Sequence, residues 1–266
     1  CTLLVPTMIY TLLDHPELDR TDLSSLHTLL YGASPMSPTR LVEGLERIGP
    51  VFAQLYGQTE GYPVSFLKRS DHDVAQPDLF SSCGLPTSGS QVVLLDDDDQ
   101  PVAPGGVGEL CVRSRQVMDG YLNQPELTAA TLKNGWLHTG DMARADDRGY
   151  LYIVDRKKDM IVSGGFNVYP RDVEDVISSH PAVAMVAVIG VPDAKWGEAV
   201  TAMVVCKPGQ QVPAEVLTTM VRDRKGKVYA PKQVQFVTDL PRTAVGKIDK
   251  KVLRAPFWAG QGRNVG

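Results

Sequence analysis

Cysteine is scarce in this sequence of 266 residues, and its four copies lie far apart. Cys1, Cys83, Cys111 and Cys206 include no C-x-x-C pair, which argues against a zinc site and against a disulfide framework. This usage is typical of a reducing compartment. We therefore expect a cytoplasmic protein in which each cysteine packs as a small apolar side chain.

The sequence also lacks a basic charge excess and any long apolar run. Its formal net charge is -4, so nucleic acid and anionic membranes are not expected as main partners. No apolar run approaches the ~20 residues needed to span a bilayer, and no integral membrane segment is expected. With 43% apolar and 22% charged residues, the composition is typical of a globular protein with one large or two ordinary domains.

An initiator methionine and a signal peptide are absent from the amino terminus. The apolar stretch Leu3–Leu13 begins almost at once, without the positive charge that precedes such a stretch in a secretory signal. We therefore expect the sequence to be a piece of a longer protein.

Apolar patterning predicts that helices and strands alternate along the chain. Residues 1–50 read as helix and strand in turn, with a helix over 35–47 that has Pro38 in its first turn. Further helices are predicted from Pro170 onward and over 212–221. Strands are predicted at 51–56, 91–95, 109–113, 150–154, 160–162, 183–191, 200–205 and 233–237. The alternation after residue 160 is long enough for a small separate domain, with the polar run 155–159 as its boundary.

A polar turn, residues 56–61, follows the strand predicted at 51–56. The carboxyl end of a strand is where α/β folds place ligands. Thr59 can donate to a phosphate oxygen, Glu60 can hold Mg²⁺, and Tyr56 offers a ring on which a base can stack. Taken alone, the segment is better explained as an ordinary polar turn.

A second polar segment covers residues 137–141 and continues, after Gly149, into 155–159. The carboxylate of Asp141 can accept both hydroxyls of a ribose, and Arg156 can pair with a phosphate or ribose oxygen. Beyond them, Gly164 and Gly165 allow close approach of a backbone or a thin ligand. Each of these residues alone is explained as well by a surface loop or a turn.

A third motif covers residues 241–251, where Lys247 follows a glycine and precedes an apolar residue. Such a loop can project an ammonium group into a cleft. A basic turn that only faces water is the alternative.

In this order the three motifs resemble the adenylate-forming superfamily of acyl-CoA synthetases, nonribosomal adenylation domains and luciferases, and the resemblance covers nearly the whole chain. It implies an α/β fold in two parts. Residues 1–157 would be the C-terminal part of a large layered AMP-binding domain whose upstream half is missing. Residues 158–266 would be a small, mobile α+β domain.

The resemblance implies a nucleotide site in the first part of the chain. Residues 31–35 resemble the family's adenine-contacting turn, with Ala33 and Ser34 in place of the usual Gly and Ala. Residues 56–60 match the family's ATP and Mg²⁺ motif, which makes Thr59 and Glu60 catalytic and Glu60 the metal ligand. The implied nucleotide-binding residues are Ala33, Ser34, Pro35, Gln54, Tyr56, Gly57, Asp141 and Arg156.

The resemblance also assigns residues of the second part. Lys158 matches the hinge between the two domains, and Lys247 matches the lysine that contacts the carboxylate and the α-phosphate during adenylation. Gly164 and Gly165 match glycines that line a pantetheine tunnel. Trp196 falls near that tunnel in CoA ligases, although simple packing explains it equally well.

The implied activity is that of an ATP-dependent acyl-CoA ligase that uses ATP, Mg²⁺ and coenzyme A. A fatty acid is the expected substrate because the whole second half resembles bacterial fatty-acyl-CoA ligases, and aryl acids remain open. The family's Gly-rich phosphate loop has no equivalent in residues 1–50, so the chain alone is expected to be a poor catalyst. The alternatives are an adenylation domain that loads a carrier protein and a non-catalytic nucleotide- or CoA-binding module.

Overall fold

The computed structural model of this protein describes residues 1–243 and 246–259. Residues 244–245 of the third motif, and 260–266 at the end of the predicted small domain, lie outside the described residues. The chain forms two compact units, Cys1–Val154 and Asp155–Gly266. The boundary predicted between residues 157 and 158 lies just beyond this division, and the match of these units to the family's two domains stays a prediction.

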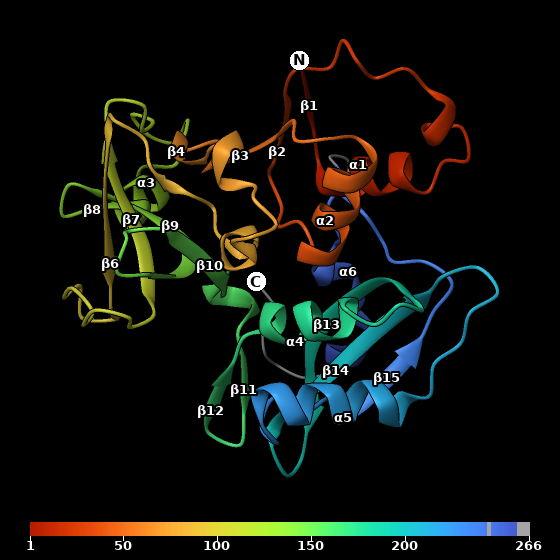
Figure 1. The fold of residues 1–266 in the computed structure, drawn as a ribbon. Coiled ribbons are helices and arrows are strands. Elements are labelled where there is room, and N and C mark those ends of the chain that lie inside the picture. The colour runs from red at the N-terminus through yellow and green to blue at the C-terminus, as the bar shows by residue number, and fades with distance from the viewer. Residues whose placement is uncertain (244–245, 260–266) are drawn as a thin grey trace. The chain divides into compact units, whose positions relative to one another are not determined.

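A five-stranded mixed sheet organises the start of the first unit (Figure 1). Its three leading strands are parallel, whereas the last two run antiparallel to their neighbours. In sheet order the strands are β1 (Thr2–Leu4), β2 (Leu29–Gly32), β3 (Phe52–Gln58), β4 (Gly61–Leu67) and β5 (Leu85–Pro86). The crossovers are helices α1 (Pro6–Leu13) and α2 (Pro38–Arg47). The carboxyl ends of β2 and β3 therefore meet at one edge of the sheet.

Helices α1 and α2 pack against this sheet through an apolar cluster. Each helix begins with a proline in its first turn, where a missing N–H costs nothing. Ile9 and Leu13 of α1 and Leu41 of α2 are buried in one cluster with Phe52 of β3. This periodic burial explains why the sequence predicts alternating helix and strand here.

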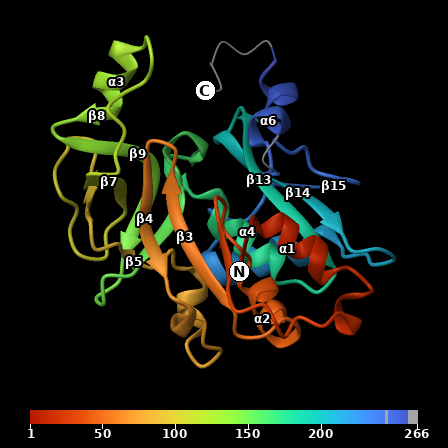
Figure 2. The same ribbon diagram turned by 90° about the horizontal axis from the view of Figure 1, so that it is seen from above.

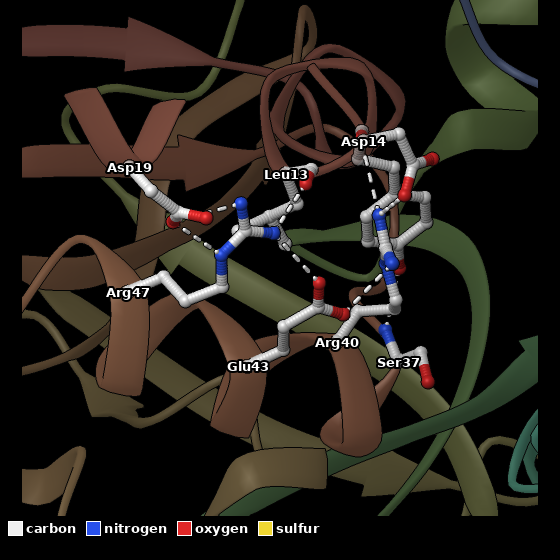
Figure 3. A network of polar contacts seen from close by, with 8 residues as sticks. Leu13, Asp14, Asp19, Ser37, Arg40, Glu43 and Arg47 are labelled. Atoms are coloured by element: carbon white, nitrogen blue, oxygen red, sulfur yellow. Dashed lines mark hydrogen bonds and ion pairs between the residues drawn. The ribbon is translucent and has the colours of Figure 1, made fainter. Parts of the chain in front are cut away.

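A network of ion pairs joins α2 to the residues that follow α1 (Figure 3). Arg40 lies 2.7 Å from Asp14 and 2.8 Å from Glu43. Arg47 lies 3.0 Å from Asp19 and 3.2 Å from the same Glu43. A single exposed ion pair stabilises little, because two side chains lose conformational entropy to form it. When one carboxylate is shared by two guanidinium groups, fewer side chains are ordered for each pair. The network therefore helps to fix α2 against the segment that follows α1.

A second sheet, with antiparallel pairings, completes the first unit. Its order is β10-β9-β7-β6, and β8 pairs with β9. The strands are β6 (Ser90–Leu95), β7 (Gly108–Ser114), β8 (Leu132–Lys133), β9 (Trp136–Ala145) and β10 (Leu151–Arg156), and α3 (Pro125–Thr131) precedes β8. Bridges between Gly61 and Val117 and between Gly84 and Leu151 connect the two sheets.

The second unit is a five-stranded sheet covered by helices on both faces (Figure 2). Its order is β12-β11-β14-β13, with β15 parallel to β14. The strands are β11 (Ile161–Ser163), β12 (Phe166–Val168), β13 (Val183–Asp193), β14 (Gly197–Cys206) and β15 (Gln233–Phe236). The helices are α4 (Pro170–Ser178), α5 (Ala214–Lys225) and α6 (Lys250–Trp258).

Alternate residues of β13 serve the two faces of this sheet. Val186 and Val188 join the cluster that contains residues of α4 and α5. Ala187 and Ile189 point the other way, into clusters that include Leu253 of α6. Because both faces are covered, the strand reads as one continuous apolar run, which is why it is easily found in the sequence.

Four short 3-10 turns complete the described structure: Leu18–Arg20, Arg69–Asp71, Pro77–Ser81 and Lys157–Asp159. Among the described residues, no helix is long and apolar enough to cross a membrane.

The α/β fold class predicted from the sequence is confirmed, and the local differences include the following three. The helix predicted over 35–47 begins at Pro38. Strand β3 continues to Gln58, so Gly57 lies within the strand and the turn is shorter than predicted. Residues 137–141 lie in strand β9, where a loop was an open explanation for Asp141.

Residues 155–259 should fold alone, whereas residues 1–154 should aggregate. The second unit covers both faces of its sheet, but the first exposes Leu3, Met8 and Leu12 and leaves β1 as an edge strand. Exposed apolar side chains beside an open strand edge promote association between chains. Each part would be produced separately and examined by light scattering and thermal melting. A monomeric, cooperatively melting 1–154 would contradict this prediction.

Candidate functional site

A hydrogen bond between Tyr56 and Asp141 forms the centre of the candidate site in the first unit. The Tyr56 hydroxyl, on β3, donates to Oδ2 of Asp141, on β9, at 2.7 Å. Burial raises the pKa of Tyr56 well above its usual value, and the adjacent Asp141 carboxylate raises it further. The phenol is therefore neutral and serves as a donor. Asp141 itself is only 6% exposed.

The backbone before Asp141 is shaped by a bulge in the β7–β9 pair. Cys111 pairs with His138 and Glu109 with Met142, so three residues of β9 face one residue of β7. Gly140, at the centre, has a φ of 71°, which a residue with a side chain rarely adopts. Bulges of this kind re-aim side chains beside functional sites.

Polar contacts hold this bulge in place. The backbone N–H of Gly140 donates to Oε1 of Glu109 at 3.0 Å. The Thr139 hydroxyl donates to the carbonyl of Leu110 at 2.7 Å and accepts from the N–H of Asp141 at 3.1 Å. These hydrogen bonds fix the backbone that carries the Asp141 side chain.

Thr59 and Glu60 form the two-residue turn between β3 and β4. The Thr59 side chain is exposed. Glu60 is half-buried, and its Oε1 accepts a hydrogen bond from the Tyr121 hydroxyl at 2.8 Å. Its carbonyl accepts from the N–H of Met118 at 2.8 Å. The turn is therefore tied to the segment that follows β7.

The segment Ala33–Pro35 leaves the end of β2, next to the strand that leads to Thr59. The register pairs Gly32 with Leu55, and a Cβ at position 32 would lie 2.3 Å from the Leu55 carbonyl oxygen. Only glycine permits this close approach of the two strands. Ala33 follows with a φ of 65° and an exposed side chain. Gln54 is half-buried, two residues before Tyr56 on β3, and so lies on the same face of the strand.

In the second unit, Gly164 and Gly165 form the turn between β11 and β12. Both have positive φ, 60° and 83°. The N–H of Gly164 donates to the carbonyl of Trp196 at 2.8 Å, and a Cβ at 164 would lie 2.7 Å from the Trp196 ring. A Cβ at Gly165 would meet no heavy atom within 4 Å. Simple packing therefore explains Gly164, whereas open space lies beside Gly165.

The Trp196 ring is 37% exposed and lies near two cations. The ammonium groups of Lys195 and Lys232 are each 5.0 Å from its centroid. An exposed ring with two positive charges can bind an anionic, aromatic group such as a nucleotide.

Lys247 lies in the connection that precedes α6. Arg242 and Ile248 form a bridge, and the N–H of Thr243 donates to the Lys247 carbonyl at 2.7 Å. The N–H of Lys247 donates in turn to the Thr243 hydroxyl at 3.2 Å. Gly246, with a φ of 79°, makes the turn. The backbone of Lys247 is therefore ordered by local contacts.

Arg156 and Lys158 are exposed at the start of the second unit. Of their acidic neighbours, Asp155 is buried and Asp159 is half-buried. Asp159 pairs with Arg254 of α6 at 2.6 Å, and both side chains are largely shielded from solvent. This contact ties the segment around Lys158 to the helix that follows Lys247.

A second buried charge cluster reinforces this tie. Lys250 of α6 pairs with Glu174 of α4 at 2.8 Å. The Asp155 carboxylate accepts from the N–H groups of Arg156 at 2.7 Å and Arg171 at 3.0 Å. Burial raises the pKa of Asp155 to about 6, against the opposing effect of Lys250.

The predicted site residues fall into two sets, one in each unit. The structure joins Tyr56 with Asp141 and places residues 33–35 and 59–60 after neighbouring parallel strands. Sequence reasoning missed Glu109, Tyr121 and the Asp159–Arg254 pair. A carboxylate inside an apolar strand was the available signal for Glu109. Nothing local indicated the partners of Glu60 or Asp159, because those contacts join residues far apart in the sequence.

Comparison with known families finds matches to two parts of this chain. Residues 1–122 match the family model for an AMP-binding enzyme, and residues 172–247 match that for an AMP-binding enzyme C-terminal domain. Over 273 residues the chain is 52% identical to a medium/long-chain-fatty-acid–CoA ligase of Mycobacterium tuberculosis, which it matches over 100% of its own length and 47% of that protein. It is 42% identical over 253 residues to a feruloyl-CoA synthase of Amycolatopsis, covering 95% of this chain and 51% of that protein.

A similar solved structure is that of the amide bond synthetase McbA from Marinactinospora thermotolerans. The TM-score is 0.91 at 42% sequence identity, over 96% of this chain and 52% of that chain. The chain thus spans about half the length of the proteins it matches.

The stability of the second unit should fall as pH rises from about 4 to about 6, owing to Asp155. Its pKa is about 6 in the folded state against 3.8 as the reference, so the folded state binds the proton more tightly. The Asp155 carboxyl contributes up to roughly 3 kcal/mol to the free energy of unfolding below pH 4, and this contribution is lost as pH rises through 6.

The measurement is urea unfolding, followed by hydrogen exchange of β13 and β14, in the wild type and in Asp155→Asn. The difference in stability between them should change with pH in this window. A constant difference would show that the carboxyl does not titrate there.

Proposed function

Because this chain belongs to the family of AMP-binding enzymes, we propose that it forms the C-terminal half of an ATP-dependent acyl-CoA ligase. The observation that carries the proposal is the buried Asp141 carboxylate, held by Tyr56 of the strand that leads into the Thr59–Glu60 turn. The 52% identity to a fatty-acid–CoA ligase supports the same class of reaction.

The reaction has two steps on this proposal. A carboxylate oxygen of the acid attacks the α-phosphorus of ATP, the bond to pyrophosphate breaks, and an acyl-adenylate forms. The thiol of CoA then loses its proton and attacks the acyl carbonyl, and AMP leaves with the electrons of the broken C–O bond. Both steps require positioning and neutralisation of phosphate charge more than proton chemistry by the protein.

The nucleotide would be held by residues of the first unit, with Arg156 added from the second. Asp141 accepts the ribose hydroxyls, and the residues at the end of β2 contact the adenine. The Tyr56 hydroxyl is already committed to Asp141 at 2.7 Å, so its role is to orient that carboxylate. Thr59, exposed in its turn, is available to donate to a phosphate oxygen.

Mg²⁺ would be held by Glu60. A carboxylate in an ordered turn is the donor this cation prefers, and the Tyr121 hydroxyl fixes one of its oxygens at 2.8 Å. When bound, the ion neutralises phosphate charge and orients the leaving group.

Coenzyme A would approach the turn at Gly164 and Gly165. The positive φ values and the open space beside Gly165 suit a thin pantetheine arm. Trp196, flanked by Lys195 and Lys232, offers a surface for the nucleotide end of CoA.

Lys247 would supply positive charge to the carboxylate and α-phosphate in the first step. Lys158 would be the hinge about which the second unit turns between the two steps. The buried Asp159–Arg254 pair, at 2.6 Å, makes α6 and the segment after the hinge move together.

A medium- or long-chain fatty acid is the proposed substrate, in the cytoplasm. The match to a feruloyl-CoA synthase keeps aryl acids as the second choice. An adenylation domain that transfers its acyl group to a carrier protein is the alternative acceptor class. The similarity to an amide bond synthetase makes the acceptor the point to test.

The test is pyrophosphate release by the full-length protein with a panel of acids, with and without CoA. Fatty acids should support release, and CoA should yield acyl-CoA. Formation of AMP-linked product without any thioester would point to another acceptor. No pyrophosphate with any acid would reject the ligase.

The same assay separates the role of Lys247. Lys247→Ala should abolish adenylate formation, because positive charge at the α-phosphate is lost. It should leave thioester formation from supplied acyl-adenylate nearly unchanged. Lys251→Ala is the matched control, since Lys251 is exposed on α6. Equal losses in both half-reactions would contradict a role confined to the first.

Asp141→Ala should weaken ATP binding more than CoA binding. Loss of a carboxylate that accepts two ribose hydroxyls costs on the order of 1.5–3 kcal/mol, or roughly a 10- to 150-fold rise in Kd. Calorimetric titration of each ligand gives the comparison, with thermal melting to confirm folding. An unchanged ATP affinity in a folded variant would make Asp141 purely structural.

A further inference from the structure

Three side chains with different metal-binding atoms meet between β7 and β9, outside the residues assigned to the nucleotide. They are Glu109 and Cys111 on β7 and His138 on β9. One ligand atom from each lies within 4.8 Å of the others. The cysteine is completely buried, and the Glu109 and His138 side chains are each 11% exposed. The cluster is therefore largely shielded from solvent.

Hydrogen bonding within this cluster satisfies the His138 ring poorly. Nδ1 of His138 lies 3.4 Å from Oε2 of Glu109 and 3.5 Å from Sγ of Cys111. A single ring nitrogen either donates to the carboxylate or accepts from the thiol, and it cannot do both. The 3.4 Å contact is also long against the usual N–H···O distance of about 2.9–3.0 Å.

The other ring nitrogen does not resolve this conflict. Nε2 of His138 is buried and has no hydrogen-bond partner among the described residues. The polar contacts of the ring in the described part of the chain are therefore those of Nδ1, toward the carboxylate and the thiol.

A thiophilic cation would satisfy all three atoms at once. Ligand atoms about 2.0–2.3 Å from Zn²⁺ in a tetrahedron lie roughly 3.3–3.7 Å from one another. The two measured separations, 3.4 Å and 3.5 Å, fall in this range. One imidazole, one thiolate and one carboxylate are also the donor types that Zn²⁺ accepts. The thiolate and carboxylate neutralise the double charge, so the occupied site carries no net charge.

The carboxylate that faces this cluster also supports the candidate nucleotide site. Oε1 of Glu109 accepts from the N–H of Gly140 at 3.0 Å, while Oε2 faces His138. A hydrogen bond to the carboxylate oxygen that does not face the metal, such as the one from Gly140, fixes the orientation of a metal-ligating carboxylate. Gly140 directly precedes Asp141, so an ion at Oε2 would bear on the bulge that places Asp141.

We propose that Glu109, Cys111 and His138 form a binding site for a single Zn²⁺ ion, or for Cd²⁺ of the same chemistry. Binding releases the Cys111 thiol proton to solvent and forms Zn–S, Zn–N and Zn–O bonds, and one water completes the tetrahedron. The ion joins β7 to β9 across the bulge and stabilises the first unit. The proposal does not rest on the ligase activity, and metal binding is tested without measuring that activity.

The experiment is a titration of the chelator-treated 266-residue chain, carrying Cys1→Ser, with Co²⁺ as a spectroscopic substitute for Zn²⁺. One equivalent should produce the visible bands of a tetrahedral site and a near-ultraviolet thiolate-to-cobalt band, and Zn²⁺ should remove both. Zn²⁺ should also raise the melting temperature, because a ligand that binds only the folded state stabilises it.

Three variants identify the ligands. Cys111→Ser should remove the thiolate band, and His138→Gln should weaken binding at least tenfold. Glu109→Gln should weaken binding and also abolish the rise in melting temperature. Cys206→Ser is the matched control, because Cys206 lies in the second unit, and it should bind as the parent does.

Two results would overturn the proposal. One is an octahedral spectrum without a thiolate band, which would leave the cluster as a hydrogen-bonded network only. The other is a thiolate band that survives in Cys111→Ser, or an affinity that His138→Gln leaves unchanged. Circular dichroism of each variant confirms folding, and an unfolded Cys111→Ser would be replaced by Cys111→Ala.

Discussion

The hydrogen bond from Tyr56 to Asp141 is the contact on which the candidate site of the first unit depends. It joins β3, in a mixed sheet, to β9, in an antiparallel sheet, across 85 residues of sequence. A bond to a charged acceptor contributes on the order of 1.5–3 kcal/mol, and removing either partner leaves a buried polar group unsatisfied. The bond thereby links the strand that leads to the Thr59–Glu60 turn with the strand that carries the bulge, the two segments that we propose to bind the nucleotide.

Buried charges perform the corresponding task in the second unit. Asp159 and Arg254 at 2.6 Å, and Glu174 and Lys250 at 2.8 Å, connect α6 to the start of the unit and to α4. Breaking one member of such a pair strands a charge in the protein, which costs more than the pair contributes. The helix after Lys247 is therefore held against the rest of the second unit by paired charges.

The sequence predicted the elements whose residues are buried with a regular period. Strand β13 reads as an apolar run because helices cover both of its faces, and α4 has Pro170 at its first position. Strand β9 was missed because His138, Thr139 and Asp141 interrupt its apolar pattern, and each is polar for a tertiary reason. Helix α6 was missed because Pro256 lies inside it. Polar residues and prolines at such positions depend on tertiary contacts, which a local sequence pattern does not show.

The same limit explains the cysteines. Spacing rules for zinc sites recognise ligands that lie close together in the sequence, such as a C-x-x-C pair on one turn. Cys111 and His138 are separated by a hairpin and a helix, and only the pairing of β7 with β9 makes them neighbours. Glu109 joins them because residues two apart on a strand project from the same face. The absence of a C-x-x-C pair argues against a zinc site, whereas the site proposed from the structure needs no such pair. A spacing rule cannot detect ligands that strand pairing brings together. Cys111 and His138 can be recognised as neighbours only when the register of β7 and β9, with its bulge at Gly140, is known.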